Sequence, residues 1–130
     1  MPMKILAVPH HVTRALEWMQ LARASPVRVD TFAHLWFALI ALVRFGQPKG
    51  AWDLTRILAY LAQLRSGAGG HPVLGRARID ALEALFRKAE QARRLLFHRD
   101  DDTLITDELI EELEDGLFQL IEPEVARYRA

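Results

Sequence analysis

The stretch FAHLWFALIALVRF, from Phe32 to Phe45, decides the fold of this 130-residue chain. Its only polar side chains are those of His34 and Arg44, so a helix formed here would be apolar on every side. Such a helix is either central to a helical bundle or partly covered by another subunit. A membrane span needs about 20 apolar residues, and this stretch is too short for one. We therefore expect a buried central helix, with His34 as a core or boundary histidine rather than a ligand.

Outside this stretch, apolar residues recur at every third or fourth position, which is typical of amphipathic helices. Pro26 ends the first helix, because proline disfavours helical geometry in the residue before it. Asp30 or Thr31 provides an N-cap for the second helix, and Gly46 ends it. The glycine-rich segment 67–72 separates the third helix from the fourth. We expect helices over 12–24, 31–45, 51–66, 74–97 and 106–121.

Length and composition indicate an all-α protein, a single-domain bundle of about five helices. The chain is 51% hydrophobic and 26% charged, which is ordinary for a globular domain. It has no cysteine, so neither disulfides nor thiolate metal ligands are expected. We expect one domain over 1–130, with an N-terminal arm over 1–11 and an acidic C-terminal helix and tail over 100–130. The apolar run near the N-terminus ends before it reaches signal-peptide length, which predicts a cytoplasmic protein.

Charge is divided unevenly along the chain. Residues 100–126 contain eleven Asp or Glu and no Lys or Arg, whereas residues 1–99 contain fifteen basic and six acidic side chains. A separated charge pattern either closes on itself within the fold or offers one sign to a partner. If it closes, Thr106 caps the fifth helix, and the acids of that helix face solvent or the fourth helix. The bases then expected within reach are Arg78, Lys88, Arg93 and Arg94.

In the other interpretation, the fifth helix is an acidic face that imitates nucleic-acid phosphates and docks on a basic protein surface. Charge steering would then set the rate of association. The candidate partner-binding residues of this acidic face are Asp107, Glu108, Glu111, Glu112 and Asp115.

The fourth helix is rich in arginine, but its charges alternate in sign at steps of three and four residues. Pairs such as Glu83 with Arg87 and Glu90 with Arg94 would neutralise one face of this helix. The second and third helices have at best the spacing of a helix-turn-helix. Their exposed candidates for reading DNA are Arg56, Gln63 and Arg65. A small DNA-binding transcriptional regulator is therefore the alternative interpretation.

An apolar central helix that is not fully enclosed would offer a contact surface to a homodimer partner or to another protein. The candidate residues of this apolar interface are Phe32, Trp36, Phe37 and Ile40. The sequence contains no catalytic motif, and we expect neither an enzyme nor a cofactor. His10 and His11 are adjacent, and adjacent residues do not face one site on a helix or strand, so no metal site is expected.

Two stretches resemble small all-helical accessory proteins of proteobacterial phages and integrative mobile elements. They are TFAHLWFALIALVRFGQPKGAWDLTRILAYLAQL at 31–64 and LEALFRKAEQARR at 82–94. The shared pattern is an apolar helix, a glycine-containing turn, a second helix with Trp or Leu, and a basic alanine-rich helix. The resemblance covers about half of the chain and assigns no functional residue. It implies a binding protein from a mobile element, and some small phage proteins block host defence nucleases.

Together these observations predict a non-enzymatic protein-binding module in the cytoplasm. It would engage a host factor, or a second copy of itself, through the acidic helix or the apolar helix face. Nucleic acid is the less favoured partner, and no membrane partner is expected.

Overall fold

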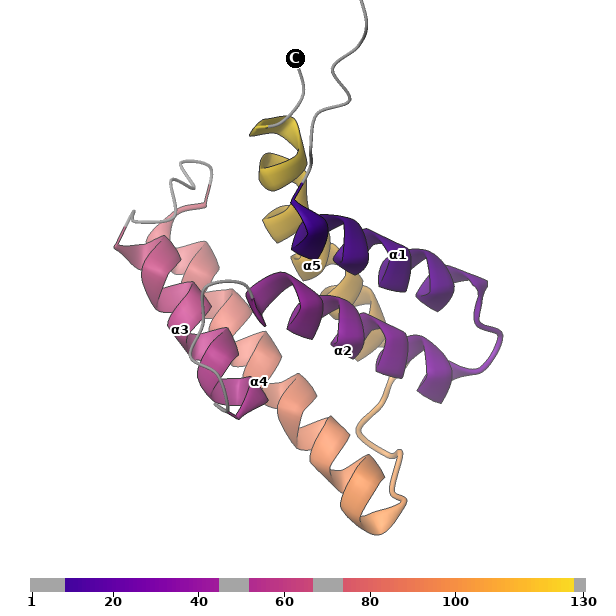
Figure 1. The fold of residues 1–130 in the computed structure, drawn as a ribbon. Coiled ribbons are helices and arrows are strands. Elements are labelled where there is room, and N and C mark those ends of the chain that lie inside the picture. Colours follow the sequence, from indigo (N-terminus) through magenta and orange to yellow (C-terminus); the bar gives the residue numbers. More distant parts are fainter. Residues whose placement is uncertain (1–8, 45–51, 67–73, 128–130) are drawn as a thin grey trace, which may run out of the picture.

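The structure is a computed structural model that describes residues 9–44, 52–66 and 74–127. These residues form five helices and no strand (Figure 1). The predicted all-α bundle of five helices is confirmed. The helices are α1 (His10–Ala24), α2 (Arg28–Arg44), α3 (Asp53–Arg65), α4 (Arg76–Arg99) and α5 (Asp107–Arg127).

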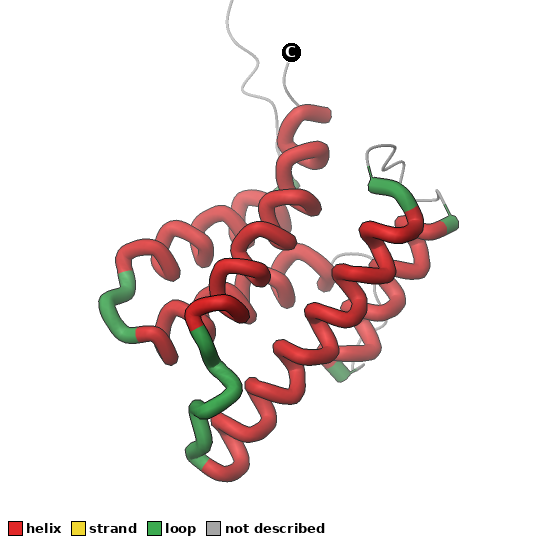
Figure 2. Tube along the Cα trace, turned by 180° about the vertical axis from the view of Figure 1, so that it is seen from behind, coloured by secondary structure: helices red, strands yellow, loops and turns green. Residues whose placement is uncertain are grey.

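The helices are arranged as two antiparallel hairpins and a fifth helix. α1 lies beside α2, and α3 lies beside α4 (Figure 1). α5 crosses behind the α1–α2 hairpin and contacts α1, α2 and α4, as the opposite view in Figure 2 shows. The chain therefore surrounds α2 with α1, α3 and α5.

α2 is the central helix, as its sequence predicts. Its position among three neighbours removes most of its apolar side chains from water, which is the main gain in free energy available to them. Val29, Ala33 and Ala41 are half-buried, and Phe37 is the one exposed apolar side chain among the described residues of α2, with 41% of its surface exposed. The buried side chains of α2 are those of Phe32, Leu35, Trp36, Ala38, Leu39, Ile40, Leu42 and Val43.

Two helices begin earlier than predicted. α1 begins at His10, so His10 and His11 belong to a helix and not to the predicted arm, of which residues 1–8 lie outside the described part. α2 begins at Arg28, which places the two predicted N-cap residues inside its first turn. The N–H and the hydroxyl of Thr31 both donate to the Val27 carbonyl, at 3.0 and 3.2 Å, so Thr31 already belongs to a helical turn that begins before it. The predicted stops at Gly46 and at 67–72 lie outside the described residues.

α5 begins close to its predicted start and continues beyond its predicted end. The Leu109 N–H donates to the Thr106 hydroxyl at 3.1 Å, which is the N-cap bond expected of Thr106. The helix then passes through Pro123 to Arg127, although proline removes one helical hydrogen bond. Ile121 is buried, and Val125 packs on the core about one turn later. Apolar packing on both sides of the proline therefore favours continuation of the helix over a stop.

α4 and α5 approach closely at Gly116. A Cβ atom at this position would lie 2.9 Å from Cδ2 of Leu82 and 3.2 Å from Cδ2 of Leu85. The glycine thus allows the two helices to pack without a side chain between them. None of the helices in the described ranges is long and apolar enough to cross a membrane.

Candidate functional site

A groove of about 620 Å³ opens along the α1–α2 hairpin. α1 contributes basic and aromatic residues, α2 contributes mainly apolar residues, and Asp53 at the start of α3 completes the lining. Since ligand pockets are mostly apolar with a few polar groups at their edges, this composition is typical of a binding site. The lining residues are His10, His11, Arg14, Trp18, Trp36, Phe37, Ile40, Ala41 and Asp53.

Two aromatic contacts position the side chains in this groove. The Trp18 ring lies 5.0 Å from the Phe37 ring, at 52° to it, within the range of favourable aromatic pairs. Trp18 also stacks on His34, with ring centroids 5.7 Å apart and the ring planes at 23°. Phe37 is thus held by an aromatic neighbour while it remains exposed to solvent.

His34 is a boundary histidine, as predicted, and its hydrogen bonding defines its tautomer. The Ser25 hydroxyl lies 2.8 Å from the Leu21 carbonyl and 3.0 Å from Nδ1 of His34. The hydroxyl has one proton, which it donates to the carbonyl, so Nδ1 must donate to the hydroxyl oxygen. This bond fixes the ring beneath Trp18 and connects the groove to the end of α1.

The four predicted interface residues have different environments. Phe32 is a core residue, because only 1% of its surface is exposed. Trp36 and Ile40 are largely buried and form the floor of the groove, while Phe37 alone reaches solvent. The sequence interpretation missed Trp18. The spacing of Trp18 from His10 and Arg14, at four-residue steps on one side of α1, is a signal that could have identified it.

The expectation that His10 and His11 would not face one site is wrong, because both line the groove although they are adjacent in sequence. Burial lowers the pKa of His11, and the nearby Glu124 carboxylate opposes this shift. At the rim, Arg14 lies 3.7 Å from Glu17 in an exposed ion pair. The groove therefore combines an apolar floor with a polar edge on α1.

Arg93 supports the floor of the groove from beneath. Its guanidinium lies 5.4 Å from the centroid of the Trp36 ring and 5.7 Å from that of Phe97. Its Nε and Nη2 donate to the two carboxylate oxygens of Glu90, both at 3.0 Å. This is the forked geometry that arginine forms with a carboxylate. We call Trp36, Glu90, Arg93 and Phe97 the Arg93 clamp.

The predicted pairing of Glu90 with Arg94 is wrong, since Glu90 pairs with Arg93. The two rings around the Arg93 guanidinium explain the choice, because they add cation–π attraction that Arg94 does not receive. The predicted pair of Glu83 with Arg87 is confirmed, with Arg87 Nε 3.1 Å from the carboxylate.

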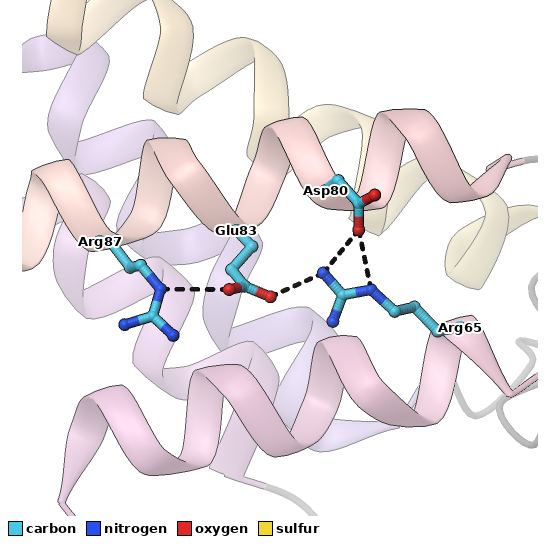
Figure 3. Close-up of polar contacts among 4 residues, drawn as sticks. All are labelled: Arg65, Asp80, Glu83 and Arg87. Carbon is cyan, nitrogen blue, oxygen red and sulfur yellow. Dashed lines mark hydrogen bonds and ion pairs between the residues drawn. The ribbon is translucent and has the colours of Figure 1, made fainter.

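Arg65 of α3 joins this charged network and connects α3 to α4. Its guanidinium lies 2.9 Å from Asp80 and 2.6 Å from Glu83 (Figure 3). The hydrogen bond from Arg65 lowers the pKa of Glu83, and the bond from Arg87 adds to this effect. Arg65 is thus an ion-pair partner within the fold and not an exposed residue free to read DNA.

The acidic face of α5 closes only partly on the rest of the protein. Asp107 pairs with Arg28 at 2.9 Å, and Asp115 pairs with Arg78 at 3.7 Å. A further pair joins Glu114 to Arg23 at 3.5 Å. Two of these bases come from α1 and α2, so of the four bases predicted on α4 only Arg78 takes part. Among the described residues, three exposed carboxylates of this face have no ion pair, those of Glu108, Glu111 and Glu112.

Comparisons of this chain with known protein families, with curated proteins and with solved structures find no match.

Proposed function

We propose that the protein is a non-enzymatic protein-binding module whose α1–α2 groove receives an apolar segment of a protein partner. The observation that carries the proposal is the exposure of Phe37, which lies beside Trp18 on a helix whose other large apolar side chains are mostly buried. Aromatic side chains that border a formed pocket are frequent anchors of protein interfaces. An amphipathic helix of the partner fits this groove, with its apolar side chains toward Trp36 and Ile40.

Three carboxylates of the acidic face that have no ion pair in the described part of the structure support a second element of the proposal. Glu108, Glu111 and Glu112 lie at three- and four-residue spacing and therefore form one stripe on the helix surface. This acidic stripe would attract a basic partner and raise its rate of association. The resemblance to phage and mobile-element proteins extends the proposal to a host factor as the partner.

The alternative of a DNA-binding regulator has less support. A reading helix presents unpaired polar side chains to base edges and phosphates. In α3, Arg65 is held by Asp80 and Glu83. The remaining candidates, Arg56 and Gln63, are too few for the usual set of contacts to bases and backbone.

Affinity capture with matched variants tests the use of the groove. Phe37→Ser removes the exposed aromatic side chain, whereas Leu21→Ser removes an apolar side chain of α1 that is 50% exposed and does not line the groove. We expect a host protein that is captured by the wild type and by Leu21→Ser but lost from Phe37→Ser. Equal capture by all three proteins, each with the same helical circular dichroism, would exclude the groove as the binding site.

The acidic stripe has its own test. Glu111→Lys combined with Glu112→Lys should preserve helical circular dichroism, because Glu and Lys have similar helix propensity. With the captured partner, the association rate should fall in this variant, and the wild-type rate should fall as salt increases. Rates that respond to neither change would leave the stripe as a solvated surface.

A further inference from the structure

A second hollow lies next to the groove, between the first turn of α3 and the second half of α4, and Asp53 lines both. It consists of two adjoining pockets, of about 590 and 710 Å³, that share Leu54, Glu90, Arg94 and His98 as lining residues. The shared lining makes them one cleft. It continues from Trp52 on one side to Arg99 on the other.

The charged groups of this cleft leave an excess of positive charge. The charge of Glu90 is neutralised by Arg93, which donates one hydrogen bond to each of the two Glu90 carboxylate oxygens. Arg94 and His98 have no ion-pair partner among the residues that the structure describes. Arg87 contacts Glu83, but its side chain remains 53% exposed. Since Asp53 is the remaining acid of the wall, the positive charge is concentrated on α4.

Trp52 borders the same cleft, with 83% of its surface exposed. Its carbonyl accepts the Arg56 N–H at 3.0 Å, so the backbone fixes the residue at the start of α3. An indole this exposed contributes little to the stability of the fold, because folding removes little of its apolar surface from water. Its ring is therefore free to stack on a flat partner. Phe97, 57% exposed, adds a second aromatic group on the adjacent surface of α4.

We propose that this cleft binds single-stranded nucleic acid, with Arg94 and His98 contacting phosphates and a base stacked on Trp52. Proteins that bind single strands combine a positively charged groove with exposed aromatic rings, and the cleft has both. In a duplex the faces of the bases are covered by their neighbours, so stacking on Trp52 selects a single strand. An acidic protein segment would need an additional aromatic or apolar side chain at the right place to cover the indole, whereas every nucleotide carries both a phosphate and a base. This proposal rests on Trp52, Arg94 and His98, none of which lines the α1–α2 groove.

The experiment is a titration of the full chain into a fluorescein-labelled oligothymidylate of about 12 nucleotides, followed by fluorescence anisotropy at increasing salt. Trp52→Ala should weaken binding roughly 5- to 150-fold, which is the measured range for loss of one base–aromatic stack. Arg94→Gln should weaken binding and reduce the slope of log K against log salt by about 0.7, the value for one phosphate contact on a single strand.

Arg76→Gln is the matched control, because Arg76 is an exposed arginine of the same helix, at the end remote from the cleft. It should change neither the affinity nor the slope as much as Arg94→Gln does. A duplex of the same length should bind more weakly, and polyglutamate should not displace the oligothymidylate. The proposal is overturned by absence of binding at low salt, by insensitivity to Trp52→Ala, or by preference for the duplex or for polyglutamate.

Discussion

Replacing Arg93 with alanine should destabilise the protein by about 2 to 3 kcal/mol, because it leaves the Glu90 carboxylate without its partner. The Glu90 and Arg93 side chains are only 12% and 22% exposed, so water can solvate little of the Glu90 carboxylate once Arg93 is removed. Breaking a fully buried pair costs about 3 to 5 kcal/mol, and the partial exposure of Arg93 reduces this range. The predicted loss of stability includes the cation–π attractions of Arg93 to Trp36 and Phe97, because Arg93→Ala removes them together with the charge.

Urea unfolding followed by circular dichroism measures this free energy. Arg94→Ala is the control, because Arg94 neighbours Arg93 on α4 but has no ion pair in the described structure, and its loss should cost less than about 0.5 kcal/mol. The double variant Glu90→Met with Arg93→Met should cost less than Arg93→Ala alone, since it leaves no buried charge unpaired. A cost for Arg93→Ala no larger than that for Arg94→Ala would refute the reasoning.

Three further predictions concern packing, backbone and pH. Gly116→Val should destabilise the protein by about 1 to 3 kcal/mol through its clash with Leu82, and adding Leu82→Ala should recover part of this loss in the same urea assay. Asp100→Gly should increase the free energy of unfolding by about 0.5 kcal/mol and so raise the thermal midpoint, because Asp100 ends α4 in the left-handed region at φ 52°. The lowered pKa of Glu83 means that its contribution to stability is present above the ordinary carboxyl pKa and is lost as pH falls through the lowered value. The stability difference between wild type and Glu83→Gln should therefore disappear on acidification, and a pH-independent difference would contradict the Arg65 network.

The sequence predicts the helices and the central place of α2 because both follow from local spacing and from an uninterrupted apolar run. It predicts the Glu83–Arg87 pair for the same reason, since both residues lie on one helix. The choice of Arg93 over Arg94 by Glu90 depends on Trp36, a residue of another helix. Neither helix spacing nor charge order contains that information.

In the candidate site, too, local spacing predicts some features and tertiary packing determines the others. The sequence predicts an apolar interface on α2, and Phe37 lies at the surface there. Which face of α2 stays open depends on how α1, α3 and α5 pack around it. The sequence also predicts the acidic face of α5, yet two of the bases that pair with α5, Arg23 and Arg28, come from the α1–α2 hairpin. These pairs join residues far apart in sequence, and only the tertiary arrangement determines them.

Site-specific photo-crosslinking tests most directly whether the α1–α2 groove is the binding surface. Benzoylphenylalanine placed at Phe37 lies in the groove, and the same group placed at Leu21 lies on an exposed part of α1 outside it. After irradiation in host extract, the protein labelled at 37 should form a covalent adduct with one partner, and the protein labelled at 21 should not. Absence of an adduct from position 37, or the same adduct from both positions, would contradict the proposed function.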